Sequence, residues 1–204
     1  DGIGGHAYVT GFFRDKLMLD SIHAVVVNDS TGLTLQGKIH NYKRRNPNKF
    51  LAAFKAYLHP SGAGVEAEFR DNKGYVGLNL GAQANISPDG YRLHLYPEHP
   101  ILAYRTFTVN NDNYAYYGLG GAIGANIDLL ADDGTGLRIY GEPNDSLTDI
   151  TLSLSQVNLK ELAASLPYVP AMQGMLTGDI HVTDDHKSIS ALADINLTDF
   201  EYQG

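Results

Sequence analysis

The chain has 204 residues, of which 43% are hydrophobic, so it can bury a core, and its formal net charge is −8. This acidic balance argues against a nucleic-acid partner, which needs Lys and Arg gathered on one face. The one basic cluster, Lys43, Arg44 and Arg45, precedes the turn-forming segment 46–48 and indicates an exposed loop. The absence of cysteine excludes disulfides, thiolate metal sites and thiol catalysis.

Targeting signals are not apparent in the chain. A membrane helix requires about 18 consecutive apolar residues, and no apolar run in the sequence approaches this length. The first residues do not have the pattern of a signal peptide. The sequence starts abruptly at Asp1 and stops abruptly at Gly204. We therefore expect a piece of a longer protein whose targeting and anchoring segments lie elsewhere.

Apolar and polar residues alternate along many short segments, and a period of two indicates strands with one buried and one wet face. Turn-forming clusters separate these segments, and the 22 glycines fit frequent tight turns. The clearest alternating segments are residues 65–70, 93–95, 150–155, 176–183 and 189–197. The pattern predicts an all-β fold, an elongated curled sheet of antiparallel, meandering strands. We expect one domain over residues 1–204, with a weak sub-boundary near 97–103.

One short helix is predicted near residues 158–166. Asn158 can act as the N-cap, with Glu161 three residues later in the capping-box arrangement. Prolines at positions 167 and 170 are expected to end the helix. Its apolar face is predicted to carry Leu159, Leu162 and Leu166.

Candidate chemistry is sparse. His94, Glu98 and His99 could be drawn as a metal site, but His94 falls on the polar side of a strand and the prolines at 97 and 100 predict a turn. The acidic segment 184–187 indicates a hairpin turn. The glycine-rich segment 118–124 is followed by an alternating strand, whereas a nucleotide loop needs a helix there. We therefore predict no catalytic, metal or cofactor site.

Tyrosine is abundant, with 13 in the chain. Tyr114, Tyr116 and Tyr117 lie close to several Asn and Asp residues in the segment 110–113. Tyrosine is an ordinary sheet residue with an apolar body and a wet end. These residues also allow a second interpretation of the function, as an alternative to the scaffold described next. In it, the chain is an extracellular β-domain that binds glycans through a platform made of these tyrosines and amides.

The residues from about 101 to 202 resemble the large TamB-like proteins of the Bacteroidetes type, relatives of the AsmA and bridge-like lipid-transfer families. The resemblance lies in the segments 107–113, 123–129, 150–159 and 168–182, which run from a strand through a short Asn-Leu helix and proline to a Gly-x-Leu-x-Gly-Asp-Ile strand. It implies a taco-like half-pipe with an apolar concave side. It also implies a non-catalytic periplasmic scaffold, whose parent protein is anchored in the inner membrane and reaches an Omp85-type outer-membrane partner.

That class is linked to outer-membrane protein assembly and to phospholipid transport between the membranes. We accordingly expect a phospholipid or a membrane-protein client in an apolar groove. A slice of a continuous sheet also leaves unpaired strands, so edge-to-edge self-association is expected. The predicted groove residues are Val65, Ala67, Phe69, Leu93, Leu95, Ile127, Leu129, Ile150, Leu152, Leu154, Ile180 and Val182.

Overall fold

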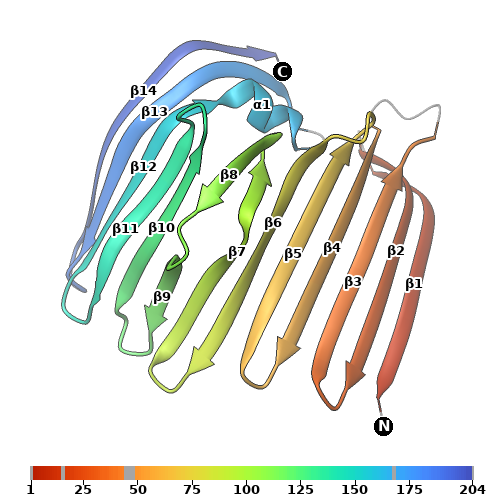
Figure 1. Ribbon diagram of the computed structural model, residues 1–204, viewed down its shortest axis with the longest axis horizontal. Helices are drawn as coiled ribbons and strands as arrows, with labels where there is room; N and C mark the ends of the chain where they lie inside the picture. Colours follow the sequence, from red (N-terminus) through yellow and green to blue (C-terminus); the bar gives the residue numbers. More distant parts are fainter. Residues whose placement is uncertain (1, 15–16, 44–48, 167–168, 204) are drawn as a thin grey trace.

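The computed structural model describes residues 2–14, 17–43, 49–166 and 169–203. Within these ranges the chain forms one 14-stranded sheet and one short helix, which confirms the predicted all-β fold (Figure 1). The elements are β1 (Ile3–Arg14), β2 (Leu17–Asp29), β3 (Gly32–Asn41), β4 (Phe50–His59), β5 (Gly62–Asp71), β6 (Val76–Ser87), β7 (Gly90–Leu102), β8 (Arg105–Val109), β9 (Tyr114–Gly118), β10 (Ile123–Ala131), β11 (Gly136–Asn144), β12 (Thr148–Asn158), α1 (Leu159–Ala164), β13 (Ala171–Asp184) and β14 (Ile189–Gln203).

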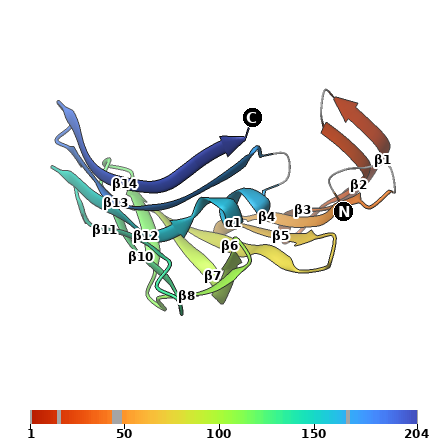
Figure 2. The same ribbon diagram turned by 90° about the horizontal axis from the view of Figure 1, so that it is seen from above.

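The sheet is an antiparallel meander, in which strands that follow each other in the chain also lie side by side. The exception is the pair β8 and β9, which share the place between β7 and β10, one near each end of those strands. The sheet is curled, and α1 lies on its inner side (Figure 2). The predicted curled, meandering sheet with one short helix is therefore confirmed.

The pairing register separates the sheet into two chemically different faces. The side chains of residues that pair directly across two strands point to the same side of the sheet. Apolar residues pair with apolar residues across several strands, as in the row Ile127, Ile139, Leu152, Ile180. We call the side of this row the apolar face. The other side, the polar face, carries rows such as Asp128, Arg138, Ser153, Asp179 and Asp194.

Two clusters of buried side chains lie on the sheet. One consists of Phe107, Val109, Ile127, Leu129 and Ala131, and the other of Leu19, Phe50 and Phe69. Leu102 packs against the first cluster and Leu78 against the second, and these two residues pair directly across β6 and β7. The sheet is thus continuous across residues 97–103.

The turn predicted at Pro97 and Pro100 is wrong. Strand β7 runs through both prolines to Leu102, with a cis peptide bond between Tyr96 and Pro97. The register against β6 is irregular between Asn79 and Gly81, which accommodates the additional residues of β7. A strand can contain proline where its ladder is interrupted by a bulge, and this explains why the residue type misled the prediction.

Two asparagine side chains bridge the break between β8 and β9. Asn113 Oδ1 accepts from Leu95 N at 2.7 Å, and Asn113 Nδ2 donates to Leu95 O at 3.3 Å. On the other side, Asn110 Oδ1 accepts from Asp128 N at 2.9 Å and its Nδ2 donates to Asn126 O at 3.2 Å. Each amide therefore takes the place of a strand residue, so that β7 and β10 keep backbone partners across the break.

Several glycines lie inside strands and opposite aromatic rings, not only in turns. Gly37 pairs with Phe54 and Gly64 with Tyr57. A Cβ on Gly64 would overlap the ring of Tyr57, and one on Gly37 would overlap the ring of Phe54. Each ring covers the space that a side chain would otherwise fill. The prediction that the glycines mainly mark tight turns is therefore incomplete.

Helix α1 spans Leu159–Ala164, within the predicted range, and Asn158 is its N-cap, with Oδ1 accepting from Lys160 N and Glu161 N. The capping box is only half formed, because the Glu161 carboxylate accepts from Arg105 Nε at 2.5 Å. The predicted leucine face is also wrong, since Leu162 and Leu166 are exposed and Ala163 is the buried helical residue. Residue 167, expected to end the helix, lies outside the described residues.

Candidate functional site: the apolar inner face

The predicted groove residues all lie on the apolar face. On one half of the sheet, Val65 pairs with Ala82, which pairs with Leu95. On the other half, Ile150 pairs with Val182 and Leu152 with Ile180. Strand β9 joins the halves, because Ala115 pairs with Leu93 on one side and with Ala125 of β10 on the other. Alternation along each strand places the remaining members on the same side.

Burial on this face changes from one end of the strands to the other. Phe69 and Leu129, near the end of the sheet where α1 lies, are buried. At the opposite end, near the β4–β5 and β9–β10 turns, Leu58 is 52% exposed, Val65 49% and Tyr117 53%. No second sheet covers the apolar face within the described part of the chain. The buried members stabilise the fold, and the exposed members form an open apolar surface.

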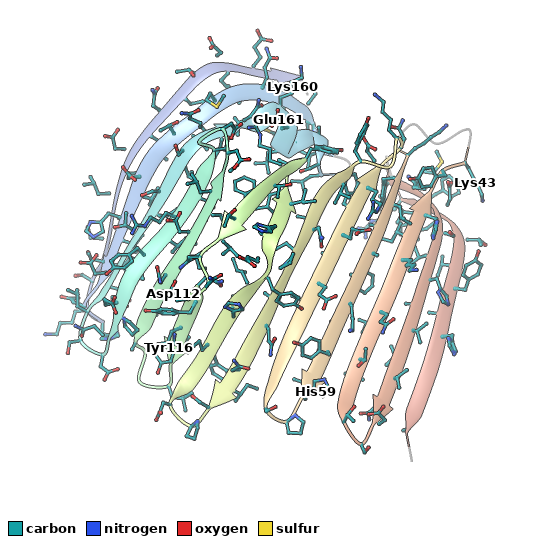
Figure 3. The ribbon with its side chains drawn as sticks, viewed as in Figure 1. Lys43, His59, Asp112, Tyr116, Lys160 and Glu161 are labelled. Atoms are coloured by element: carbon teal, nitrogen blue, oxygen red, sulfur yellow. The ribbon has the colours of Figure 1, made fainter. Side chains whose placement is uncertain are left out.

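Arg105 closes the buried end of this surface. Its guanidinium pairs with the Glu161 carboxylate of α1, pairs with Asp133 in the β10–β11 turn and donates to Thr135 Oγ1 at 3.2 Å. Glu161 and its neighbour Lys160 lie on the helix at this end of the sheet (Figure 3). Tyr104 Oη also donates to Ala164 O at 3.2 Å. These contacts hold α1 over the ends of the strands.

The polar face carries paired charges and two open hollows. Glu68 accepts two hydrogen bonds from Arg70, at 2.7 and 2.9 Å, and Glu66 accepts from Tyr96 Oη at 3.1 Å. Burial and the Glu66 carboxylate together raise the pKa of Tyr96 to about 12. One hollow, about 480 Å³, lies over β2–β6 beside Lys38. The other, about 540 Å³, is lined by His6, Tyr8, Ser21, His23 and His40.

The three tyrosines proposed as a glycan platform do not share a face. Tyr117 pairs with Tyr91 and Ile123 on the apolar face, whereas Tyr114, opposite Asn126, and Tyr116, opposite Arg92, point to the polar face. The guanidinium carbon of Arg92 lies 4.1 Å from the ring centre of Tyr114 and 5.6 Å from that of Tyr116. Adjacent strand residues point to opposite sides, so Tyr116 and Tyr117 cannot form one surface.

The neighbouring amides are engaged as well. Asn110 and Asn113 bond to the backbone, as described above, and Asn126 Nδ2 donates to Asp112 Oδ2 at 2.9 Å. Asp112 also accepts from Asn110 Nδ2 at 3.1 Å. Two of the three amides of the segment 110–113, Asn110 and Asn113, are therefore used within the sheet.

Two histidines of the segments weighed as sites, His94 and His186, lie close to backbone carbonyl oxygens. His94 Nδ1 lies 3.0 Å from the carbonyl oxygen of Asn113. In the segment 184–187, His186 Nε2 lies 3.0 Å from the carbonyl oxygen of Asp145. Across the described ranges, no three or more His, Asp or Glu side chains gather in a way that could hold a metal ion.

Comparison with known proteins adds no relative, because no protein family, curated protein or solved structure matches the chain. Among the residues that the structure describes, no helix has the length and apolar character needed to cross a membrane.

Sequence reasoning missed the residues that close the buried end. Arg105, Asp133 and Glu161 are far apart in the chain and follow no common motif, so their meeting depends on the fold. The separation of Tyr116 from Tyr117, in contrast, could have been found from strand alternation alone.

Proposed function

We propose that this chain is a non-catalytic scaffold segment that holds lipid acyl chains on its apolar inner face. The proposal rests chiefly on one observation: the apolar face is continuous along the sheet and remains partly exposed, with Leu58 52% and Val65 49% exposed. Acyl chains that lie on such a face gain about 0.8 kcal/mol for each methylene group removed from water. The polar face, with its ion pairs, is suited to contact water.

The resemblance noted in the sequence favours a periplasmic setting for this activity, within a parent protein anchored in the inner membrane. In that setting the segment supports phospholipid transport between the membranes, assembly of outer-membrane proteins, or both, together with an Omp85-type partner. The curled sheet and the apolar inner side support this proposal because a half-pipe of this kind offers hydrocarbon a dry surface. An apolar segment of a membrane-protein client would use the same surface.

Two leucines of similar exposure on opposite faces allow a matched test. Leu58 lies on the apolar face and is 52% exposed, whereas Leu130 lies on the polar face and is 56% exposed. Binding of a fluorescent phospholipid is measured for the native chain, Leu58→Asp and Leu130→Asp, with mass spectrometry of lipids that co-purify. We expect Leu58→Asp to weaken binding at least about tenfold, because a carboxylate would have to be desolvated beneath an acyl chain.

Leu130→Asp should bind phospholipid as the native chain does. Equal binding by both variants, or no recovered lipid and no binding by the native chain, would contradict the proposal. Ile127→Asp is unsuitable for this test, because Ile127 is only 5% exposed and belongs to the buried cluster, so its substitution would unfold the sheet.

A further inference from the structure

The hollow of about 480 Å³ on the polar face lies near the middle of strands β2–β6. Ala53 of β4 contributes only a methyl group to its lining, and this small side chain separates Lys38 of β3 from Glu68 of β5 in one cross-strand row. Each of these five strands has a neighbour on both sides, so the hollow does not depend on an edge of the sheet. Its volume is within the range of about 300–1,000 Å³ that is usual for small-molecule sites.

Three side chains with hydrogen-bond donors line this hollow together. Gln36 pairs directly with Lys55 across β3 and β4, so these two side chains lie next to each other on the polar face. Lys38 follows Gln36 by two residues on the same strand and therefore points to the same face, diagonal to Lys55 and within reach of a long side chain. All three residues are exposed and line the hollow. Two ammonium groups and one amide can thus contact a single ligand there.

The two lysines have no partner within the described part of the chain, whereas the carboxylates of the hollow are engaged. Neither Lys38 nor Lys55 forms an ion pair or a hydrogen bond there. Glu68 accepts two hydrogen bonds from Arg70, which compensates its charge, and Glu66 accepts from a tyrosine hydroxyl. Two ammonium groups therefore face one uncompensated carboxylate, that of Glu66. The hollow has a net positive charge.

The distribution of charge along the chain favours the same sign. Residues 1–75 contain ten Lys and Arg and seven Asp and Glu, whereas residues 76–204 contain five Lys and Arg and sixteen Asp and Glu. The hollow lies almost entirely in the first of these segments, although the whole chain has a formal net charge of −8. A local excess of positive charge attracts anions and raises their concentration at the surface. An anionic ligand therefore suits this hollow.

We propose that this hollow binds the phosphate group of a small organic phosphate monoester, with Lys38, Lys55 and Gln36 as donors. Such a group has three terminal oxygens and a charge of about −1.5 to −2 near neutral pH, which matches two ammonium groups and an amide. A carboxylate has two oxygens and a single charge, so it leaves one donor without an acceptor. Lysine commonly binds phosphate as a point charge. The inference does not depend on lipid binding, because the hollow lies on the face opposite the apolar face.

Isothermal titration calorimetry at low ionic strength tests the site, with glucose 6-phosphate as the probe. Glucose, which lacks the phosphate, and gluconate, which has a carboxylate, are the comparison ligands. We expect the native chain to bind glucose 6-phosphate at least about fivefold more tightly than gluconate and to show no binding of glucose. Lys38→Gln and Lys55→Gln should each weaken binding of glucose 6-phosphate about fivefold, because each removes one solvent-exposed charged contact. The double variant should show no measurable binding.

Lys73→Gln is the matched control, because it removes the same charge from the exposed β5–β6 turn, and it should bind as the native chain does. Circular dichroism verifies that each variant is folded. A native chain that does not bind glucose 6-phosphate, or binds gluconate equally well, overturns the proposal. An equal loss of affinity in Lys73→Gln and Lys38→Gln also overturns it, because binding would then follow the overall charge. Binding to phosphatidic acid vesicles without binding of glucose 6-phosphate would assign the phosphate to a lipid surface and contradict a small ligand. The calorimetric assay contains no lipid, so its result is independent of the lipid result.

Discussion

The side chain of Asn113 forms a two-sided hydrogen-bonded pair with the backbone of Leu95. Asn113 Oδ1 accepts from Leu95 N at 2.7 Å and Asn113 Nδ2 donates to Leu95 O at 3.3 Å, and Asn113 is buried. This is the pattern that a neighbouring strand residue would provide. The amide therefore maintains the ladder of β7 where no strand lies beside it.

Replacing Asn113 should destabilise the fold. We expect Asn113→Ala to lower the free energy of unfolding by about 1–3 kcal/mol, because the partly buried N–H and C=O of Leu95 lose their partners. Urea unfolding measures the change. Asn111→Ala, which alters an exposed residue of the same segment, should change stability by less than about 0.5 kcal/mol. Equal losses in the two variants would show that the amide bridge contributes nothing.

Gly64 provides a second test, because it lies beneath the ring of Tyr57. A Cβ at position 64 would overlap that ring, so the ring must move or the strands must separate. We expect Gly64→Ala to cost about 1–3 kcal/mol of stability, the range for overpacking a well-packed site, as measured by urea unfolding.

The double variant Tyr57→Ala/Gly64→Ala distinguishes steric conflict from a general intolerance of side chains at position 64. With the ring removed, adding the methyl group at position 64 should cost less than it does in the native background. An unchanged cost would show that the ring is not the cause.

Tyr96 should titrate at unusually high pH. Burial and the hydrogen bond to Glu66 raise its pKa from 10.0 to about 12, because both disfavour the phenolate. The neutral phenol is thus favoured in the folded state. Its contribution to stability is complete below about pH 10 and is lost as the pH rises from about 10 to about 12.

The phenolate absorbance of the folded protein checks this prediction. Tyr96→Phe should remove a transition near pH 12, and Glu66→Gln should shift that transition to lower pH, because the negative charge next to the phenol is gone. If the highest-pH part of the curve is the same in the native chain and in Tyr96→Phe, the prediction fails.

Arg105 should hold α1 in place over the buried end of the apolar face. Its guanidinium joins the β10–β11 turn to α1 through Asp133, Thr135 and Glu161. We expect Arg105→Ala to reduce stability by about 1–2 kcal/mol, a range discounted for the partly solvent-exposed partners. Hydrogen exchange should also become faster in α1 than in β3 and β4. Uniform exchange changes along the chain would contradict a local role.

The strands could be predicted because the alternation of apolar and polar residues is a local pattern of the sequence, as in residues 150–155. The helix could be predicted from Asn158, whose cap is also a local signal. The roles of Asn113 and Arg105 could not be predicted in this way. Asn113 acts as a strand residue only because β8 and β9 leave a break, and Arg105 meets Glu161 only once the sheet has curled.

In the candidate site, too, some features could be predicted from the local sequence and others depend on the fold. Alternation places the predicted groove residues on one face, but it does not tell which of them are buried. Ile127 and Val65 are similar β-branched side chains, yet the first lies within a buried cluster and the second is half exposed. Ile127 packs with side chains of β8 and β10, whereas Val65 lies near the β4–β5 turn, and only the three-dimensional arrangement fixes this difference.

The meander has a consequence for how the protein can fold and vary. Because nearly every strand pairs with its neighbour in the chain, each hairpin can form from local contacts, and such contacts favour rapid folding. Stability then accumulates hairpin by hairpin, as in repeat proteins, where each unit depends mainly on its neighbours. A hairpin could be inserted at the β4–β5 turn, or removed, without changing the topology of the others. The length of the sheet is thus a property that duplication or deletion of hairpins can adjust.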